Sequence, residues 1–234
     1  MLNDFAKLAR ECAYCGSTSD LTKEHVIPRS FEAEGAPTWH PIIVWACREC
    51  NGQKSPLDSK VRDLFAVDII GGGHGTAQKL MAGKIKRSVI RSVEIGHKHH
   101  LLELAKSMKP DQIVGSGGRV IASGMGTHLT DDPFTPWFRY VVMGISAALT
   151  EHRMIDPFEL KLGRYYPDGF EVLRQELAAS GVPDPVRLGT HTRFTHRPVD
   201  GASPGHGVWV FEFYGGVVLV VFVAPEGTDW QEGQ

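Results

Sequence analysis

Three short segments near the N-terminus decide the fold: CAYC at residues 12–15, TKEHVIP at residues 22–28 and CRECNGQK at residues 47–54. All four cysteines of the chain lie in two CxxC pairs, Cys12 with Cys15 and Cys47 with Cys50. Each two-residue spacer allows a tight turn that aims two thiolates at one ion, and four thiolates at about 2.3 Å complete a tetrahedral zinc site. The sequence therefore predicts a structural Zn²⁺ ion.

Disulfide bonds and thioredoxin-type redox chemistry are the competing uses of paired cysteines. Residues 1–10 lack the apolar core of a signal peptide, which favours a cytoplasmic chain whose thiols stay reduced. A redox motif needs one pair that opens a helix, whereas this chain has two pairs. Zinc is the favoured interpretation, and the other two stay open.

The segment between the cysteine pairs is longer than in an ordinary zinc ribbon, because 31 residues separate Cys15 from Cys47. Residues 21–27 alternate weakly and end at a proline, and the IIVW run at residues 42–45 is typical of a partner strand. Residues 32–41, with a glycine and two prolines, predict a loop. Apolar residues at helical spacing follow the second pair, so the expected order is knuckle, strand, loop, strand, knuckle, helix.

With EHVIPRS at residues 24–30 and CxxCNxxKS at residues 47–55, residues 12 to about 60 resemble the HNH, or ββα-metal, endonuclease family in its zinc-knuckle form. The resemblance implies hydrolysis of phosphodiester bonds, with His25 as the general base and with Glu24 and Asn51 as ligands of a catalytic Mg²⁺ or Mn²⁺. Neutral imidazole is suited to accept a proton from water near neutral pH, and hard cations prefer carboxylate and amide oxygens. DNA is the favoured substrate, cut to leave a 5′-phosphate.

The chain departs from the family pattern at two places. Many members have Asp where Glu24 stands, and the central asparagine that steadies the catalytic loop is missing from WHPIIVWA at residues 39–46. His40 is the candidate substitute. Asn51 also suits a helix N-cap. The alternative function is a catalytically weak, zinc-dependent nucleic-acid-binding module, and a third is a zinc-held interaction protein.

A net charge of −2 gives the chain no global basic field, but the charge is unevenly distributed. Residues 79–109 contain eight Lys or Arg and two Glu. Two interpretations of this basic stretch stay open: it extends a phosphate-binding surface, or it forms an ordinary solvated helix face. Its three histidines, His97, His99 and His100, favour solvent exposure over metal binding. The basic residues expected to contact phosphates lie within the motif itself: Lys23, Arg29, Arg48 and Lys54.

The fold class is α+β, with a zinc-stabilised ββα-metal nuclease module followed by a mixed helical and antiparallel-sheet domain. We divide the chain into the nuclease module at residues 1–70, a basic helical connection at 71–130 and an α+β domain of unknown role at 131–234. The glycine-rich residues 71–75 lack the lysine of a phosphate-binding P-loop and predict a flexible connection.

The last segment has clear secondary-structure signals but no recognisable chemistry. Helices are expected from Thr135-Pro136 to Leu149 and at residues 168–179, and strands at residues 119–122, 186–194, 208–213 and 217–223. The apolar run at residues 217–224 is too short to span a bilayer as a helix, so no membrane contact is expected. Support of the module, or a homodimer through this segment, is its expected role.

Overall fold

The structure is a computed structural model that describes residues 8–32, 41–70, 74–114, 120–126, 132–151, 153–154, 157–165, 175, 178–179, 185–190, 192–199, 201–214 and 217–229. Its elements follow one another as β1 (Leu21–His25), the 3₁₀ turn η2 (Arg29–Phe31), β2 (Ile43–Cys47), α1 (Arg48–Ile70), α2 (Gly75–Leu80), the π-helical turn η3 (Met81–Ile85), α3 (Lys86–Glu94), α4 (His100–Ser107), β3 (Lys109–Val114), β4 (Val120–Gly126), α5 (Phe134–Thr150), β5 (Phe158–Tyr165), β6 (Val186–Arg187), β7 (Thr192–Pro198), β8 (Gly207–Phe213) and β9 (Val217–Pro225).

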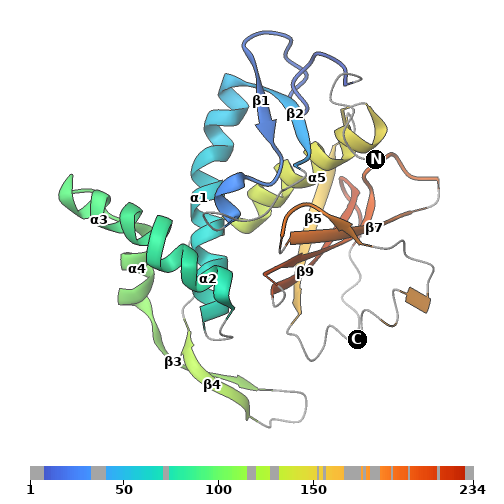
Figure 1. Cartoon of the computed structure of the whole chain (residues 1–234). Coiled ribbons are helices and arrows are strands. Elements are labelled where there is room, and N and C mark those ends of the chain that lie inside the picture. Colours follow the sequence, from blue (N-terminus) through green and yellow to red (C-terminus); the bar gives the residue numbers. More distant parts are fainter. Residues whose placement is uncertain are drawn as a thin grey trace.

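The N-terminal module has the expected ββα order. β1 pairs antiparallel with β2, in a register that sets Leu21 opposite Cys47 and His25 opposite Ile43. α1 begins at the residue after β2 ends, so the second cysteine pair lies at the junction of strand and helix. Figure 1 shows the hairpin lying along the first half of α1. The α+β class and the zinc-knuckle ββα arrangement are confirmed.

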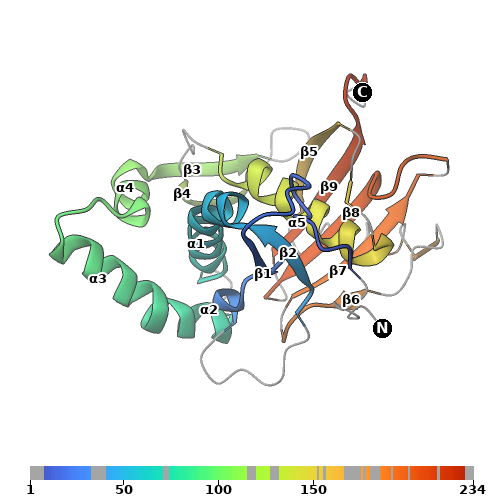
Figure 2. The same ribbon diagram turned by 90° about the horizontal axis from the view of Figure 1, so that it is seen from above.

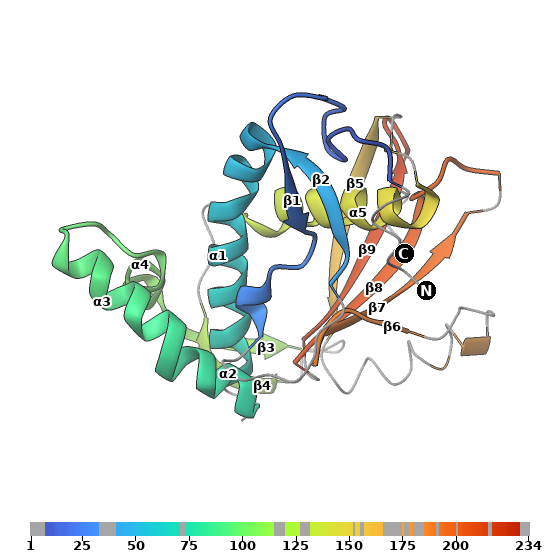
Figure 3. The ribbon, with the colours of Figure 1, turned by 45° about the horizontal axis from the view of Figure 1, so that its top comes forward.

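α5 lies between this module and a five-stranded antiparallel sheet of order β5-β9-β8-β7-β6 (Figure 3). One side of the helix faces the hairpin and α1, and the other faces the sheet. β9 is buried over most of its length, as expected for a strand that is apolar on both faces. The sheet therefore supports the module through α5.

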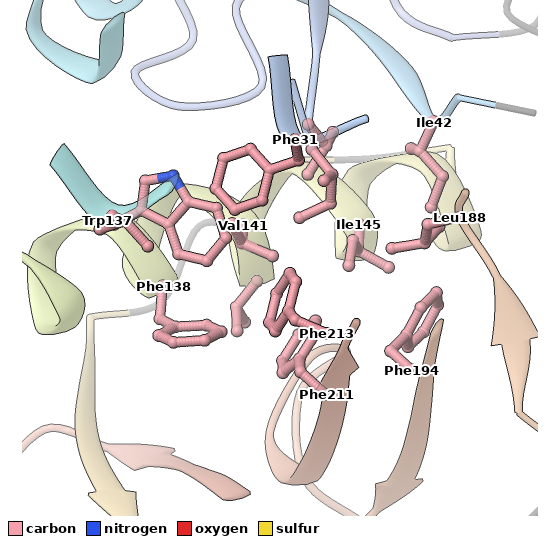
Figure 4. Close-up of a cluster of buried hydrophobic side chains, with 14 of the residues drawn as sticks. Phe31, Ile42, Trp137, Phe138, Val141, Ile145, Leu188, Phe194, Phe211 and Phe213 are labelled. Atoms are coloured by element: carbon pink, nitrogen blue, oxygen red, sulfur yellow. The ribbon is translucent and has the colours of Figure 1, made fainter. Parts of the chain in front are cut away.

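A single aromatic core joins the three layers (Figure 4). Phe31 and Ile42 reach α5 from the hairpin side, while Phe211 and Phe213 of β8 reach it from the sheet. The Phe31 ring stacks on the fully buried Trp137 with centroids 5.4 Å apart and planes 12° apart. Stacked aromatic pairs contribute about 0.5–1.5 kcal/mol beyond their buried area. The module and the C-terminal segment thus share one core, and the segment boundaries at residues 70 and 131 stay a prediction.

The basic stretch forms α2, η3, α3 and α4, which lie on the side of α1 opposite the sheet (Figure 2). α3 buries none of its side chains. The helix expected from Thr135 to Leu149 corresponds to α5, and the hairpin expected at residues 208–223 corresponds to β8 and β9. The strands β3 and β5 are not predicted from the sequence. No helix among the described residues has the length and apolarity to cross a membrane.

The strand expected at residues 186–194 is divided into β6 and the start of β7 by a turn at residues 188–190. The loop at residues 33–40, the glycines at 71–73 and most of the helix expected at residues 168–179 lie outside the described residues.

Candidate zinc centre and nuclease site

The first knuckle is a tight turn ahead of β1. Gly16 has φ +80°, a left-handed conformation that costs glycine little, and its N–H donates to the Cys12 carbonyl at 2.8 Å. The Cys12 N–H in turn donates to the Ser17 carbonyl at 2.8 Å. In the second knuckle, the Cys50 N–H donates to the Cys47 sulfur at 3.5 Å. Both turns bring two sulfurs to one side of the backbone.

The four sulfurs form one cluster whose members all lie within 4.8 Å of one another. The Cys15 and Cys47 Sγ atoms are 3.7 Å apart, close to the edge of about 3.8 Å in a tetrahedron with metal–sulfur bonds of about 2.3 Å. A disulfide needs about 2.05 Å, and none of the four cysteines forms one. The cluster has the donor set and spacing of a closed structural zinc site.

β1 presents two of its side chains to α1. Because side chains alternate along a strand, Thr22 and Glu24 share one face of β1, and that face meets α1. The Asn51 Nδ2 donates to Thr22 Oγ1 at 3.2 Å, and Lys54, one turn further along α1, donates to Glu24 Oε1 at 2.8 Å. Glu24 and Asn51 therefore both lie where β1 meets the first turns of α1.

Lys54 is the centre of a buried ion-pair network. Its ammonium is fully buried and donates to both Asp58 oxygens at 2.8 and 2.9 Å, to Glu24, and to the His25 carbonyl at 3.4 Å. Asp58 Oδ1 also accepts from the Trp137 indole N–H of α5 at 2.7 Å. This placement corrects the expectation that Lys54 contacts a phosphate, because two carboxylates already neutralise its charge away from solvent.

Asp58 and Trp137 belong to the same network, although neither lies in a recognised motif of the sequence. The Lys54–Asp58 spacing of four residues on one helix was an available signal. Trp137, 79 residues further along the chain, carried no such signal. Burial raises the pKa of Asp58 to about 6, and the Lys54 ammonium opposes that shift.

His25 ends β1 and is partly buried. Burial lowers the pKa of His25, the charges of Lys54 and Arg29 lower it further, and Glu24 opposes the shift. The imidazole is therefore neutral near neutral pH. Val26, the next residue, packs against α5 at Gly144, where an added Cβ would lie 2.7 Å from a Val26 methyl. Only glycine allows the helix to approach the strand this closely.

The other expected site residues are exposed or lie outside the described residues. Lys23, Arg29 and Arg48 are exposed around the hairpin and the start of α1, where a phosphate can reach them. His40 is outside the described residues.

The ββα hairpin and helix with two cysteine knuckles define the class of this segment: a zinc-held ββα-metal module. Residues 12–65 match the family of HNH endonucleases, which confirms the resemblance and supports a nuclease-type function with nucleic acid as substrate. The matched segment spans both knuckles, the hairpin and most of α1. The chain has no match among the curated proteins or the solved structures.

Proposed function

We propose that the protein is a metal-dependent endonuclease that hydrolyses phosphodiester bonds in DNA, with His25 as general base. The observation that supports this most directly is that the end of β1, which carries Glu24 and His25, packs against the part of α1 that carries Asn51, in a segment that matches HNH endonucleases. The proposal carries three family roles onto residues of this chain.

The neutral His25 imidazole takes a proton from water, and the water oxygen attacks phosphorus. The bond from phosphorus to the 3′ oxygen breaks, so the product carries a 5′-phosphate. A divalent cation, when bound, stabilises charge on the phosphoryl and leaving oxygens. Glu24 and Asn51 supply a carboxylate and an amide oxygen, the donor types that a hard cation prefers. Lys54 already holds one carboxylate oxygen of Glu24, so Glu24 and Asn51 would hold such a cation through their remaining oxygen atoms.

Lys54 holds the catalytic pair in position rather than contacting the substrate. Its ammonium contacts both the Glu24 side chain and the His25 carbonyl, and Asp58 links it to Trp137 of the core. The strand end that carries His25 is thereby fixed relative to both α1 and α5.

The exposed basic residues give the proposed DNA contacts. Lys23, Arg29 and Arg48 surround the hairpin, and α3 adds exposed Lys86, Arg87 and Arg91 on the far side of α1. Contacts of this kind bind the phosphate backbone without reading sequence and weaken as salt rises.

The proposal is tested by nicking of supercoiled plasmid in the presence of Mg²⁺ or Mn²⁺. The expected result is cation-dependent conversion to open circles with 5′-phosphate ends. Plasmid that stays supercoiled with either cation, although the zinc-loaded protein binds it, contradicts the proposal.

Such binding without cleavage is the signature of the second candidate function, the weak nucleic-acid-binding module. Two observations favour that candidate: Lys54 already pairs with Glu24, and residues 39–46 lack the central asparagine. Binding that weakens with salt, in the absence of cleavage, supports it.

The dependence of cleavage on pH follows from the lowered pKa of His25. The base works only when neutral, so cleavage should persist as pH falls to the ordinary histidine value of 6.5 and decline below it. A bound cation lowers the pKa further and keeps the same sign. The measurement is kcat/KM against pH, and an acid limb with its midpoint above 6.5 contradicts the assignment.

The metal assignment predicts that Glu24→Gln and Asn51→Ala each raise the Mg²⁺ or Mn²⁺ concentration needed for half-maximal nicking. Glu24→Gln removes the negative charge of one proposed ligand, and Asn51→Ala removes the oxygen of the other. Glu49→Gln is the matched control, because it removes an exposed carboxylate from the first turn of the same helix. An unchanged metal requirement in both variants places the cation elsewhere.

A further inference from the structure

A second cluster of metal-binding side chains lies where α1 meets the start of α4. Asp63 of α1 is 1% exposed, and its Oδ2 lies 3.1 Å from His100 Nε2 and 3.8 Å from His99 Nε2. The three atoms all lie within 4.8 Å of one another. The two histidine rings stack with centroids 4.5 Å apart. Solvent exposure was the expectation for both histidines, yet His99 is only 5% exposed.

The two Asp63 oxygens differ in their partners. Oδ1 accepts from the Arg62 guanidinium through Nε, at 2.7 Å, and through Nη2. Oδ2 and His100 Nε2 are both buried, and neither has a hydrogen-bond partner among the described residues, although they lie 3.1 Å apart. Their short separation without hydrogen-bond geometry means that the ring nitrogen does not aim a proton at the oxygen. A buried polar atom without a partner is costly, so both atoms call for a shared partner.

We propose that Asp63 Oδ2, His99 Nε2 and His100 Nε2 bind a divalent transition metal such as Zn²⁺. One carboxylate and two imidazoles are a donor set suited to zinc and related ions. In a tetrahedral site with bonds of about 2.0–2.2 Å, ligand atoms lie about 3.3–3.6 Å apart, and the two observed separations from Oδ2 bracket that range.

Three protein ligands leave the fourth position to water, unlike the closed site of four cysteines. His100 is about a quarter exposed, with 26% of its side chain accessible, and gives the ion a route from solvent. The Arg62 contact to Oδ1 orients the carboxylate so that Oδ2 faces the histidines.

Metal binding at His99 is coupled to the start of α4. His99 is the N-cap residue of this helix, and its Nδ1 accepts from the Leu101 N–H at a long 3.3 Å. In that neutral form the proton is on Nε2, beside Ser88 Oγ at 3.3 Å. Loading the metal on Nε2 moves the proton to Nδ1 and gives up the capping bond.

This site is separate from the nuclease site. Asp63 follows Asn51 by twelve residues on α1, which places their backbones about 18 Å apart along the helix axis. A metal here joins α1 to the helical segment that carries the exposed basic residues of α3. The inference does not depend on nuclease activity.

The test is metal content of the full-length protein after zinc saturation and removal of loosely bound ions. His100→Gln should lower the zinc content by one equivalent per chain, while His97→Gln, at a neighbouring exposed histidine, should leave it unchanged. Asp63→Asn is the second variant, expected to lose the same equivalent. Equal zinc content in the parent and in His100→Gln overturns the proposal.

Cobalt substitution shows whether the variants remain folded. The four-cysteine site gives intense sulfur-to-metal charge-transfer absorption, which should be the same in parent and variants. The proposed site, with nitrogen and oxygen ligands, should add only the weaker visible bands of tetrahedral cobalt, and His100→Gln should remove them. Retention of those bands in His100→Gln overturns the proposal as well.

Discussion

Replacement of His25 by alanine is expected to slow plasmid nicking by about two to four orders of magnitude, because it removes the imidazole proposed as the general base at the end of β1. The fold should tolerate the change, since the side chain is partly buried and the Lys54 contact at this residue is to the backbone carbonyl. The measurement is the single-turnover rate of nicking at saturating cation and enzyme.

Two observations control this experiment. His97→Ala removes an exposed histidine from the turn before α4 and should cut at the parental rate. DNA affinity of His25→Ala should stay close to that of the parent, because the proposed binding contacts are the exposed basic residues. A His25→Ala protein that nicks at the parental rate means that another group activates the water.

The parts of the fold that the sequence predicts correctly are those set by local signals. Pro28 ends the stretch that contains β1, the IIVW run gives β2, and the CxxC spacing places both knuckles. The β8–β9 hairpin is predicted in the same way, from two apolar runs that a short turn connects. Each of these features depends on residues close together in the chain.

The features that the sequence did not predict depend on residues far apart. The sequence predicts that Lys54 is an exposed phosphate contact. In the structure α1 packs against β1 and α5, and Glu24, Asp58 and Trp137 enclose the Lys54 network. The sequence around His99 is typical of an exposed polar turn. In the structure, His99 packs against Asp63 of α1. Burial of a charged side chain depends on tertiary partners, which a single sequence does not reveal.

The missed strands have two different causes. β3 reads KPDQIV, and its proline and aspartate are disfavoured in strands, so pairing with β4 overrides local preference. β5 begins FELKL, whose alternation was an available signal. Its partner β9 lies more than fifty residues further along the chain, so pairing itself was not visible.

β1 is joined to the start of α1 at three places along its length. The zinc site lies beside Leu21, which pairs with Cys47, and the Lys54 network lies at Glu24, about 10 Å further along the strand. Between them, Asn51 bonds to Thr22. Loss of the zinc therefore frees one end of the strand, while the other end keeps its ion pair only as long as α1 and α5 stay packed.

Cys47→Ser is expected to remove the zinc and unfold the nuclease module. Zinc binding in small isolated modules is worth on the order of 10 kcal/mol of folding free energy, comparable with the whole stability of a typical domain, about 5–15 kcal/mol. Cys47 ends β2 beside the start of α1, so its loss should disturb strand and helix together. Glu24, His25 and Asn51 then separate, and nicking should stop.

The shared core extends this effect beyond the module. Phe31 stacks on Trp137, and its carbonyl accepts a hydrogen bond from Tyr214 at 2.9 Å, so unfolding of the hairpin exposes one side of α5. We expect the midpoint of thermal unfolding to fall for the C-terminal sheet as well, although its strand pairing does not involve the zinc. Circular dichroism and zinc content are the measurements, with Ser19→Ala, an exposed change near the first knuckle, as control. Chelation of Mg²⁺ alone should stop cleavage reversibly without unfolding the protein. A zinc-free Cys47→Ser protein that stays folded and cuts DNA refutes a structural role for the zinc.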